Sequence, residues 1–443
     1  MSAFGGGWYL AGRATGPAVT ISSPEALIGR AATLEARFDS DSPISRLDVV
    51  LEQGGQAYPV VSFDAASGAA SPLSNEGILT TPIGKEALPA LVSGPATLRI
   101  TASQPVFFGM RSAESSIARE LQVRLEPPRL GVLSLHHFIN HGGAEFVVFR
   151  ATPEDVEAGI RVGAAEYPAY PGSAVGIADA AVRVAFFGLT HDQAITEPIL
   201  AFARDAAGNE ATTPIDHRPF AKAFLQSRIN VDQAFLDRVV PAIASNTPGL
   251  TIDTGSPEGR LKGYLTINGD LRRTNDDAIA ALARQSRPEM LWTEAFAQMG
   301  NSQVESRFAD RRTYFFEDEE IDRQVHLGFD LASVRQAPVL ASNAGVVVFA
   351  NFLGIYGNCV IVDHGLGVQS LYAHLSSIEA RPGDAVTKGQ ELGRTGATGL
   401  AGGDHLHFTM LLHGTPVNPV EWWDPHWMED RVFRKVRDAG GRR

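Results

Sequence analysis

The sequence has one cysteine, Cys359, among 443 residues. A single cysteine forms no intramolecular disulfide and no cysteine-based zinc finger, so both kinds of cross-linked domain are excluded. Cys359 lies in the apolar stretch NCVIVD, which is typical of a buried strand. We therefore predict that it packs in the core as a small apolar side chain.

Long apolar runs and an excess of positive charge are also missing. No stretch approaches the ~20 apolar residues that cross a bilayer, and the opening MSAFGGGWYLAGRATG lacks the basic and hydrophobic regions of a signal peptide. We expect any membrane anchor to lie in an N-terminal segment that this sequence does not contain. The net charge of −12 argues against nucleic acid as the main partner.

The composition is that of a globular protein, and the length indicates several domains. Short alternating runs separated by turn-rich stretches fill the first half, a pattern that favours β-sandwiches. We predict a multidomain, predominantly β protein. Its expected parts are two immunoglobulin-like β-sandwiches (17–126 and 127–220), a mostly helical connector (221–305), an antiparallel-β domain (306–425) and a basic C-terminal tail (426–443).

Apolar residues at helical spacing predict the helices of the connector. These helices are expected over 221–243, 276–286 and 289–299, with Pro241 and Pro288 at boundaries. The tail RVFRKVRDAGGRR is expected to be a helix that frays into solvent.

Histidine is concentrated near the C-terminus, where seven of the twelve histidines fall between residues 326 and 426. In the run GDHLHF, a strand would place His405 and His407 on one face, about 6.6 Å apart, while the apolar residues between and after them face the core. In HLGFD, His326 and Asp330 would lie about 13 Å apart on a straight strand, too far for one ion. The chain must bend between them, and Gly328 permits a bend.

The blocks HLGFDLAS, GNCVIVDHGLGVQSLYAHLSS, RPGDAVTKGQELGRTGATG, GDHLHF and GTPVNP occur in an order that resembles the lysostaphin-type (LytM-like) zinc endopeptidases of peptidase family M23. The resemblance covers residues 306–425, a little over a quarter of the chain. It implies an antiparallel-β M23 peptidase domain with Zn²⁺ as cofactor. Its pattern assigns the matched positions in two groups: His326, Asp330 and His407 as metal ligands, and His374 and His405 as catalytic histidines.

Two histidines and one carboxylate are the ligands of a catalytic zinc site with a fourth position for water. Zinc lowers the pKa of bound water towards ~7, and histidine is the acid–base group because the sequence has no HExxH motif. The resemblance thus implies a metalloendopeptidase that cleaves peptidoglycan cross-links. The alanine- and arginine-rich composition favours the D-Ala–meso-diaminopimelate type. A peptidoglycan substrate implies a periplasmic or secreted location.

Two other functions stay open at this point. Some members of this family have lost ligands and act as scaffolds or activators of cell-wall amidases, whereas all five matched positions are intact here. The sandwiches could instead bind wall or protein partners. A regulatory protein partner, or autoinhibition by the long upstream part, is a further hypothesis, and the acidic FEDEEID (316–322) either shapes the groove or is a solvated hairpin tip.

Other candidate residues have simpler interpretations. His364 and His413 are interpreted as turn or supporting residues, and Tyr372 either lines the cleft or packs in the core. HHFINH (136–141) offers His137 and His141 to an ion, but no family block surrounds them.

Overall fold

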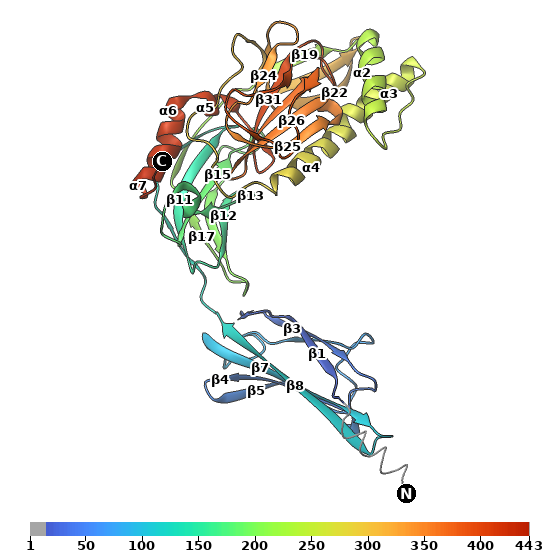
Figure 1. Cartoon of the computed structure of the whole chain (residues 1–443), viewed down its shortest axis with the longest axis vertical. Helices are drawn as coiled ribbons and strands as arrows, with labels where there is room; N and C mark the ends of the chain where they lie inside the picture. Colours follow the sequence, from blue (N-terminus) through green and yellow to red (C-terminus); the bar gives the residue numbers. More distant parts are fainter. Residues whose placement is uncertain (1–14, 443) are drawn as a thin grey trace. The chain divides into compact units, whose positions relative to one another are not determined.

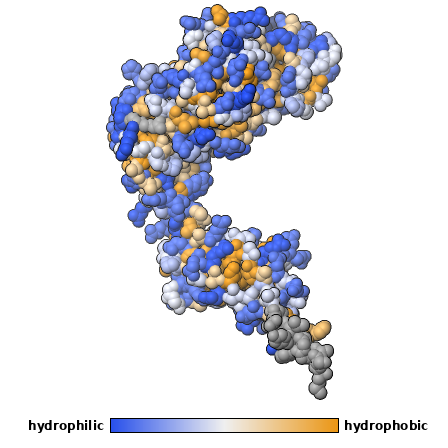
Figure 2. Space-filling model, viewed as in Figure 1, coloured by the Kyte–Doolittle hydropathy of each residue, from blue (hydrophilic) through white to orange (hydrophobic). Residues whose placement is uncertain are grey.

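The structure, a computed structural model, describes residues 15–442, so most of the N-terminal stretch discussed above lies outside it (Figure 1). The chain divides into two compact units: unit 1, residues 1–128 with 204–211, and unit 2, residues 129–203 with 212–443. Between residues 15 and 442, no helix combines the length and the apolar character needed to span a membrane. On the face of each unit seen in Figure 2, hydrophobic side chains are scattered among hydrophilic ones.

Unit 1 consists of two sheets around a core of its own. The three-stranded sheet has the order β1-β3-β6 and the five-stranded sheet the order β2-β8-β7-β4-β5. Burial alternates along β4, as expected for strands with one face on the core and one in water. The strands are β1 (Ala18–Ser23), β2 (Leu27–Ile28), β3 (Thr33–Asp39), β4 (Arg46–Gln53), β5 (Gln56–Asp64), β6 (Ile78–Pro82), β7 (Gly94–Val106) and β8 (Arg111–Val123).

The segment 129–220, most of which is the first part of unit 2, also has two main sheets, with the orders β14-β15-β11-β9 and β13-β12-β16-β17, and a parallel pair β10-β18. Two-sheet layering is therefore present in both regions, and their likeness to immunoglobulin domains stays a prediction. The strands are β9 (Arg129–Val132), β10 (His137–Asn140), β11 (Ala144–Thr152), β12 (Glu157–Val162), β13 (Ala165–Pro168), β14 (Tyr170–Pro171), β15 (Val182–Gly188), β16 (Ile199–Arg204), β17 (Glu210–Pro214) and β18 (His217–Phe220).

The connector contains a strand that the helical spacing did not predict. β19 (Gln226–Asn230) pairs in parallel with β21 (Asp310–Phe316), so the helix expected from residue 221 begins only after it. Pro241 lies inside helix α2 and is not a boundary. The helices are α2 (Gln233–Asn246), capped by Asp232, α3 (Pro257–Thr266), capped by Ser256, a π-helical turn η3 (Ile267–Leu271) and α4 (Arg272–Ala283).

The helix predicted over 289–299 is wrong, because this segment is irregular. Its apolar residues Met290, Trp292 and Phe296 are all buried, and its backbone is hydrogen-bonded to other segments. The amide of Phe296 donates to the carbonyl of Trp422 (2.9 Å), and that of Ala297 to the carbonyl of Ser342 (2.8 Å). Tertiary packing and these backbone bonds outweigh a helical pattern of apolar residues.

The C-terminal part is built on a mainly antiparallel sheet with the order β20-β23-β31-β27-β26-β25-β29, in which β32 also pairs with β31. Two smaller sheets have the strand orders β19-β21-β22 and β24-β30-β28. The strands are β20 (Gln303–Ser306), β22 (Glu319–His326), β23 (Phe329–Ala332), β24 (Pro338–Leu340), β25 (Gly345–Phe352), β26 (Asn358–Gly365), β27 (Val368–Leu375), β28 (Ser377–Ile378), β29 (Ala385–Val386), β30 (Glu391–Arg394), β31 (Leu406–Leu412) and β32 (Thr415–Val417). Cys359 on β26 is free and buried, as predicted.

The C-terminal segment returns to the first part of unit 2 instead of fraying into solvent. It comprises α5 (Pro419–Trp423), α6 (Pro425–Met428), the π-helical turn η5 (Glu429–Phe433) and α7 (Arg434–Asp438). Of these, η5 and α7 contact β11, and Figure 1 shows α7 beside it. Lys435 is buried, and its Nζ donates to Glu145 Oε1 and to the carbonyl of Phe146, both at 2.8 Å. The prediction of a solvated tail is wrong because this segment contributes Val432 and Val436 to the core.

Candidate metal centre and active site

Three side chains meet where two strands of the main sheet run beside the end of β22. His326 is the last residue of β22, and Asp330 on β23 lies opposite His407 on β31 in an antiparallel pair. His326 Nε2 and His407 Nδ1 lie 2.9 Å and 3.0 Å from Asp330 Oδ1 and 3.0 Å from each other. One ligand atom from each residue lies within 4.8 Å of the others, so the three could hold one metal ion.

The bend predicted in HLGFD is present, and Gly328 is required for a reason beyond flexibility. The chain leaves β22 at His326, bends at Gly328 and enters β23 at Phe329. A Cβ atom on Gly328 would lie 2.6 Å from the His407 ring atoms Cε1 and Nε2 and from Thr409 Oγ1. The absence of a side chain at this position lets the His407 ring pack against the bend, which brings His326 and Asp330 to the same point.

The remaining ring nitrogen of each candidate ligand is held by the protein. His326 Nδ1–H donates to the carbonyl of Arg307 (3.2 Å), and His407 Nε2–H donates to Thr409 Oγ1 (3.0 Å). Thr409 Oγ1–H in turn donates to the carbonyl of Leu327 (3.0 Å). Such bonds fix the tautomer of a metal-binding histidine and leave its other nitrogen free for the ion. The separations of 2.9–3.0 Å are a few tenths of an ångström below the ~3.4 Å edge of a tetrahedron with bonds of about 2.1 Å, so the residues fit a small divalent cation.

Electrostatics keep two of these residues, Asp330 and His407, in the protonation states that a cation needs. Burial acts to raise the pKa of Asp330, but the charge and hydrogen bond of His326, with the bonds from His405 and His407, hold that pKa well below its usual range. Burial lowers the pKa of His407 to about 4. The carboxylate is therefore ionised and the His407 imidazole neutral at neutral pH, as metal ligands must be.

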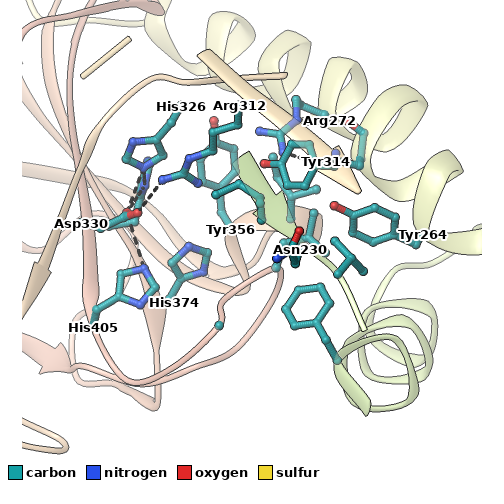
Figure 3. A pocket seen from close by; sticks show the side chains of 18 residues that line it. Asn230, Tyr264, Arg272, Arg312, Tyr314, His326, Asp330, Tyr356, His374 and His405 are labelled. Carbon is teal, nitrogen blue, oxygen red and sulfur yellow. Dashed lines mark hydrogen bonds and ion pairs between the residues drawn. The ribbon is translucent and has the colours of Figure 1, made fainter. Parts of the chain in front are cut away.

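The two predicted catalytic histidines lie next to this group. The ring centroid of His374 is 4.9 Å from that of His405 and 5.7 Å from that of His407 (Figure 3). His374 Nδ1–H donates to the carbonyl of Thr398 (2.8 Å) and His405 Nδ1–H to that of Gly403 (2.9 Å), so the Nε2 atom of each ring lies on the other side, where that of His405 faces Asp330. His374 has a φ of +63°, a backbone conformation that is uncommon outside glycine and clusters at functional sites.

The two histidines differ in their affinity for a proton. Burial lowers the pKa of His374 well below its usual value, and the neighbouring His405 and His407 add to this effect. For His405, burial also acts to lower the pKa, but the hydrogen bond and charge of Asp330 outweigh it and raise the pKa. His405 Nε2 lies 3.5 Å from Asp330 Oδ1. One neutral imidazole and one with a greater affinity for protons thus stand side by side.

All five residues line one cavity of about 240 Å³. Much of the remaining cavity wall is formed by residues that precede β22 in the chain, and the sequence motifs indicated no site role for them. Figure 3 shows several of them opposite the histidines. They include Asn230, Tyr264, Arg272, Arg312 and Tyr314. In RRTYFF, Arg312 and Tyr314 are two residues apart and share one strand face, which is the signal that could have found them.

The other candidates do not join the site. His364 is buried and bonded to the carbonyl of Ala344 and to Ser370, which confirms a supporting role. The ring of His413 stacks on Tyr170. The hydroxyl of Tyr372 bonds within the core to Ser342 and Ser370, so this residue packs in the core and does not line the cavity.

Two further sequence motifs have structural roles. His137 and His141 bond to the backbone carbonyls of Asp216 and Gln193, so the HHFINH motif stabilises the fold instead of gathering around an ion. The acidic run 316–322 spans the last residue of β21, a turn with Glu317 and Asp318 at its tip, and the start of β22. It is therefore a hairpin tip.

The model of peptidase family M23 matches residues 324–419, which contain all five histidine and aspartate positions described above. Residues 324–419 are a peptidase family M23 domain. A curated relative, the DD-carboxypeptidase/endopeptidase Mpg of Neisseria meningitidis serogroup B, is 43% identical over 97 residues, 22% of this chain and 22% of that protein. The peptidoglycan DD-endopeptidase ShyA of Vibrio cholerae is 29% identical over 163 residues, 36% of this chain and 34% of that protein.

The chain thus spans between about a fifth and a third of the length of these curated relatives. Among solved structures, a putative peptidase M23 from Pseudomonas aeruginosa is 19% identical, with a TM-score of 0.39, and the match covers 64% of this chain and 94% of that one.

Proposed function

We propose that this protein is a zinc-dependent endopeptidase that hydrolyses peptide cross-links of bacterial peptidoglycan. The observation that carries the proposal is the convergence of two histidines and one aspartate, with two further histidines beside them, on one cavity inside the M23 domain. The names of the curated relatives, a DD-carboxypeptidase/endopeptidase and a DD-endopeptidase, support a cross-link of the D-Ala–meso-diaminopimelate type. Such a substrate places the protein in the periplasm or outside the cell.

In this proposal each residue has a separate task. His326, Asp330 and His407 hold the metal ion, which when bound supplies an activated water and polarises a carbonyl. His374 and His405 present Nε2 to the cavity, where one nitrogen accepts a proton from the attacking water and the other donates a proton to the leaving amine. The protein positions these nitrogens through the carbonyls of Thr398 and Gly403, so neither ring is free to turn away.

The alternative is a non-catalytic scaffold or an amidase activator with the M23 fold. It has less support because the three candidate ligands converge and both additional histidines line the cavity. A scaffold has no need for a buried carboxylate surrounded by three imidazoles.

Regulation by the upstream part is a separate proposal. The cavity of about 240 Å³ is smaller than the ~300–1,000 Å³ typical of ligand pockets, and residues of the connector form part of its wall. We propose that this wall moves when a cross-linked peptide binds, with or without a protein partner. Tyr264→Ala, which removes a wall side chain without touching the five histidine and aspartate positions, should then increase the rate of hydrolysis. An unchanged or lower rate in the folded variant would count against autoinhibition.

The test of function uses the full chain on purified sacculi, with mass spectrometry of the released muropeptides. We expect loss of cross-linked dimers and a matching gain of monomers, abolished by a strong chelator and restored by zinc. Release of intact stem peptides from the glycan would instead indicate amidase chemistry. Undiminished hydrolysis in chelator would contradict the proposed metal centre.

Two variants separate metal binding from proton transfer. His407→Ala should lose zinc and activity together, because it removes a ligand. His405→Ala should keep its zinc while turnover falls by roughly 10²–10⁴-fold, the usual contribution of a general acid or base. Metal analysis of both purified variants, beside sacculus digestion, checks this assignment. Equal loss of zinc in the two variants would show that the roles within HLH are assigned wrongly.

A further inference from the structure

Arg312 contacts the proposed metal centre from outside the M23 domain. It lies on β21, whereas the match to the family begins at residue 324. Arg312 Nη2 donates to Asp330 Oδ2 at 3.0 Å, while Asp330 Oδ1 faces His326 and His407 at 2.9 Å and 3.0 Å. The two oxygens of one carboxylate therefore have different partners, as the dashed lines in Figure 3 show for Arg312.

The guanidinium of Arg312 is itself fixed by neighbouring side chains. Its Nη2 also donates to Ser306 Oγ (2.7 Å), and its Nε donates to Asp310 Oδ2 (3.3 Å). Ser227 Oγ–H donates to the other oxygen of Asp310 (2.8 Å). The side chains of Arg312 and Asp310 are 20% and 5% exposed, so water competes little for these bonds. A planar guanidinium is suited to this arrangement because its donors point in fixed directions.

We propose that Arg312 is a positioning residue that holds Asp330 by Oδ2, so that only Oδ1 is presented to the metal ion. The inference rests on the metal centre of the proposed function. Without the arginine, the carboxylate could rotate about its χ2 angle and offer both oxygens or neither. Partners that orient a ligand in this way typically change metal affinity by roughly 10- to 100-fold when they are removed.

Segments upstream of the M23 domain thus support the metal centre in addition to linking domains. Ser227 lies on β19, Ser306 on β20, and Asp310 and Arg312 on β21, and all four precede residue 324. The parallel pairing of β19 with β21 places Ser227 beside Arg312 in register. The strand that the sequence did not predict in the connector is therefore part of the support of the metal centre.

A purely structural ion pair would behave differently from a positioning residue. Loss of a structural pair lowers the free energy of unfolding but leaves the affinity and coordination of the metal in the folded protein unchanged. A positioning residue changes both of these properties. The decisive measurements are therefore zinc affinity and the spectrum of a bound cobalt ion, neither of which requires turnover.

The experiment uses the full chain, stripped of metal, as wild type, Arg312→Met and Arg312→Gln. The matched control is Arg323→Met on the adjacent strand β22, where the arginine pairs with Glu320 and its side chain is 74% exposed. Zinc affinity is measured by competition with a chromogenic chelator, and the visible absorption of the Co²⁺ form reports the coordination of the ion. Circular dichroism of each metal-free variant confirms that it is folded.

We expect Arg312→Met to bind zinc roughly 10- to 100-fold more weakly and to change the cobalt bands, while Arg323→Met stays within about twofold of the wild type. A folded Arg312→Met with wild-type affinity and an unchanged cobalt spectrum would overturn the inference. If Arg312→Met does not fold, Arg312→Gln gives the same two readouts and decides in the same way. A wild-type protein that takes up no zinc would overturn the metal centre itself, whereas one that binds zinc without hydrolysing peptidoglycan would overturn only the proposed function.

Discussion

The two regions of stacked β-sheets that precede the M23 domain share a two-sheet architecture but differ in how their strands are buried. In unit 1 the strands alternate between buried and exposed residues, and the core contains side chains of that unit alone. In the first part of unit 2, β15 is buried at all seven positions and β11 at seven of nine. Its core is continuous with that of the M23 domain.

This difference shows that the second region belongs to the same structural unit as the M23 domain. Strands buried on both faces need an apolar partner on each side. Here Phe186 of β15 contacts Trp292 of the connector and Trp422 of α5, with ring centroids 6.2 Å and 5.4 Å apart. In the sequence, the uninterrupted runs EFVVF and VAFF indicate strands that are buried on both faces. The alternating runs of unit 1 indicate strands that are buried on one face.

The largest effect is expected from truncation. A fragment of residues 306–443 lacks Trp292, Phe296 and the whole second region, and each large side chain left without its partners forfeits about 1.5–3 kcal/mol. Because the whole free energy of unfolding is typically about 5–15 kcal/mol, this fragment should aggregate or lack a cooperative transition. A fragment of residues 129–443 should fold and bind zinc. Solubility, thermal melting and zinc content are measured for both fragments. A stable 306–443 fragment would show that the M23 domain folds without the second region.

Single core substitutions should give a smaller effect that is confined to one unit. Phe186→Ala in unit 2 should cost about 3–5 kcal/mol and Leu98→Ala in unit 1 about 2–5 kcal/mol, since both side chains are fully buried. Tryptophan fluorescence in urea reports mainly on unit 2, which contains Trp292, Trp422, Trp423 and Trp427. Only Phe186→Ala should move that transition. An equal shift in Leu98→Ala would mean that the units unfold together.

The buried pair Lys435–Glu145 tests the attachment of the C-terminal helices to the second region. Lys435→Met leaves Glu145 buried without its cation, and we expect a loss of roughly 3–5 kcal/mol from the transition of unit 2.

The matched control for this pair is Arg437→Met, in the same helix. Arg437 pairs with Glu429, and both side chains are about half exposed, so this variant should cost less than about 1 kcal/mol. The same urea titration measures both variants. A small loss in Lys435→Met would mean that Glu145 finds another partner or takes up a proton.

Much of the C-terminal fold could be predicted from the sequence, because its strands are short, apolar and separated by glycine-rich turns. The connector was harder. Residues 289–299 have helical spacing, but Phe296 and Trp292 are placed by a core that only the tertiary structure creates. The strand β19 has its partner about 85 positions later along the chain, and no local pattern indicates such a parallel pairing.

Some residues of the candidate site could also be predicted from the sequence, and others could not. His326, Asp330, His374, His405 and His407 lie in short motifs whose order in the chain resembles a family, so they could be named in advance. Arg312 could not, since an arginine on an amphipathic strand is ordinarily a surface residue and only the three-dimensional register brings it to Asp330. The reason for Gly328 was only partly visible, because the ring of His407 that requires it comes from about 80 residues further along the chain.

The bond between Glu145 and Lys435 joins residues 290 positions apart. During synthesis the carboxylate emerges long before the ammonium group that neutralises it. Enclosing it alone in an apolar interior would carry the full cost of removing a charge from water. We therefore expect the interior around β11 to stay accessible to water until the last helices are made, so that unit 2 is completed late, whereas the core of unit 1 is formed by residues 21–123 alone.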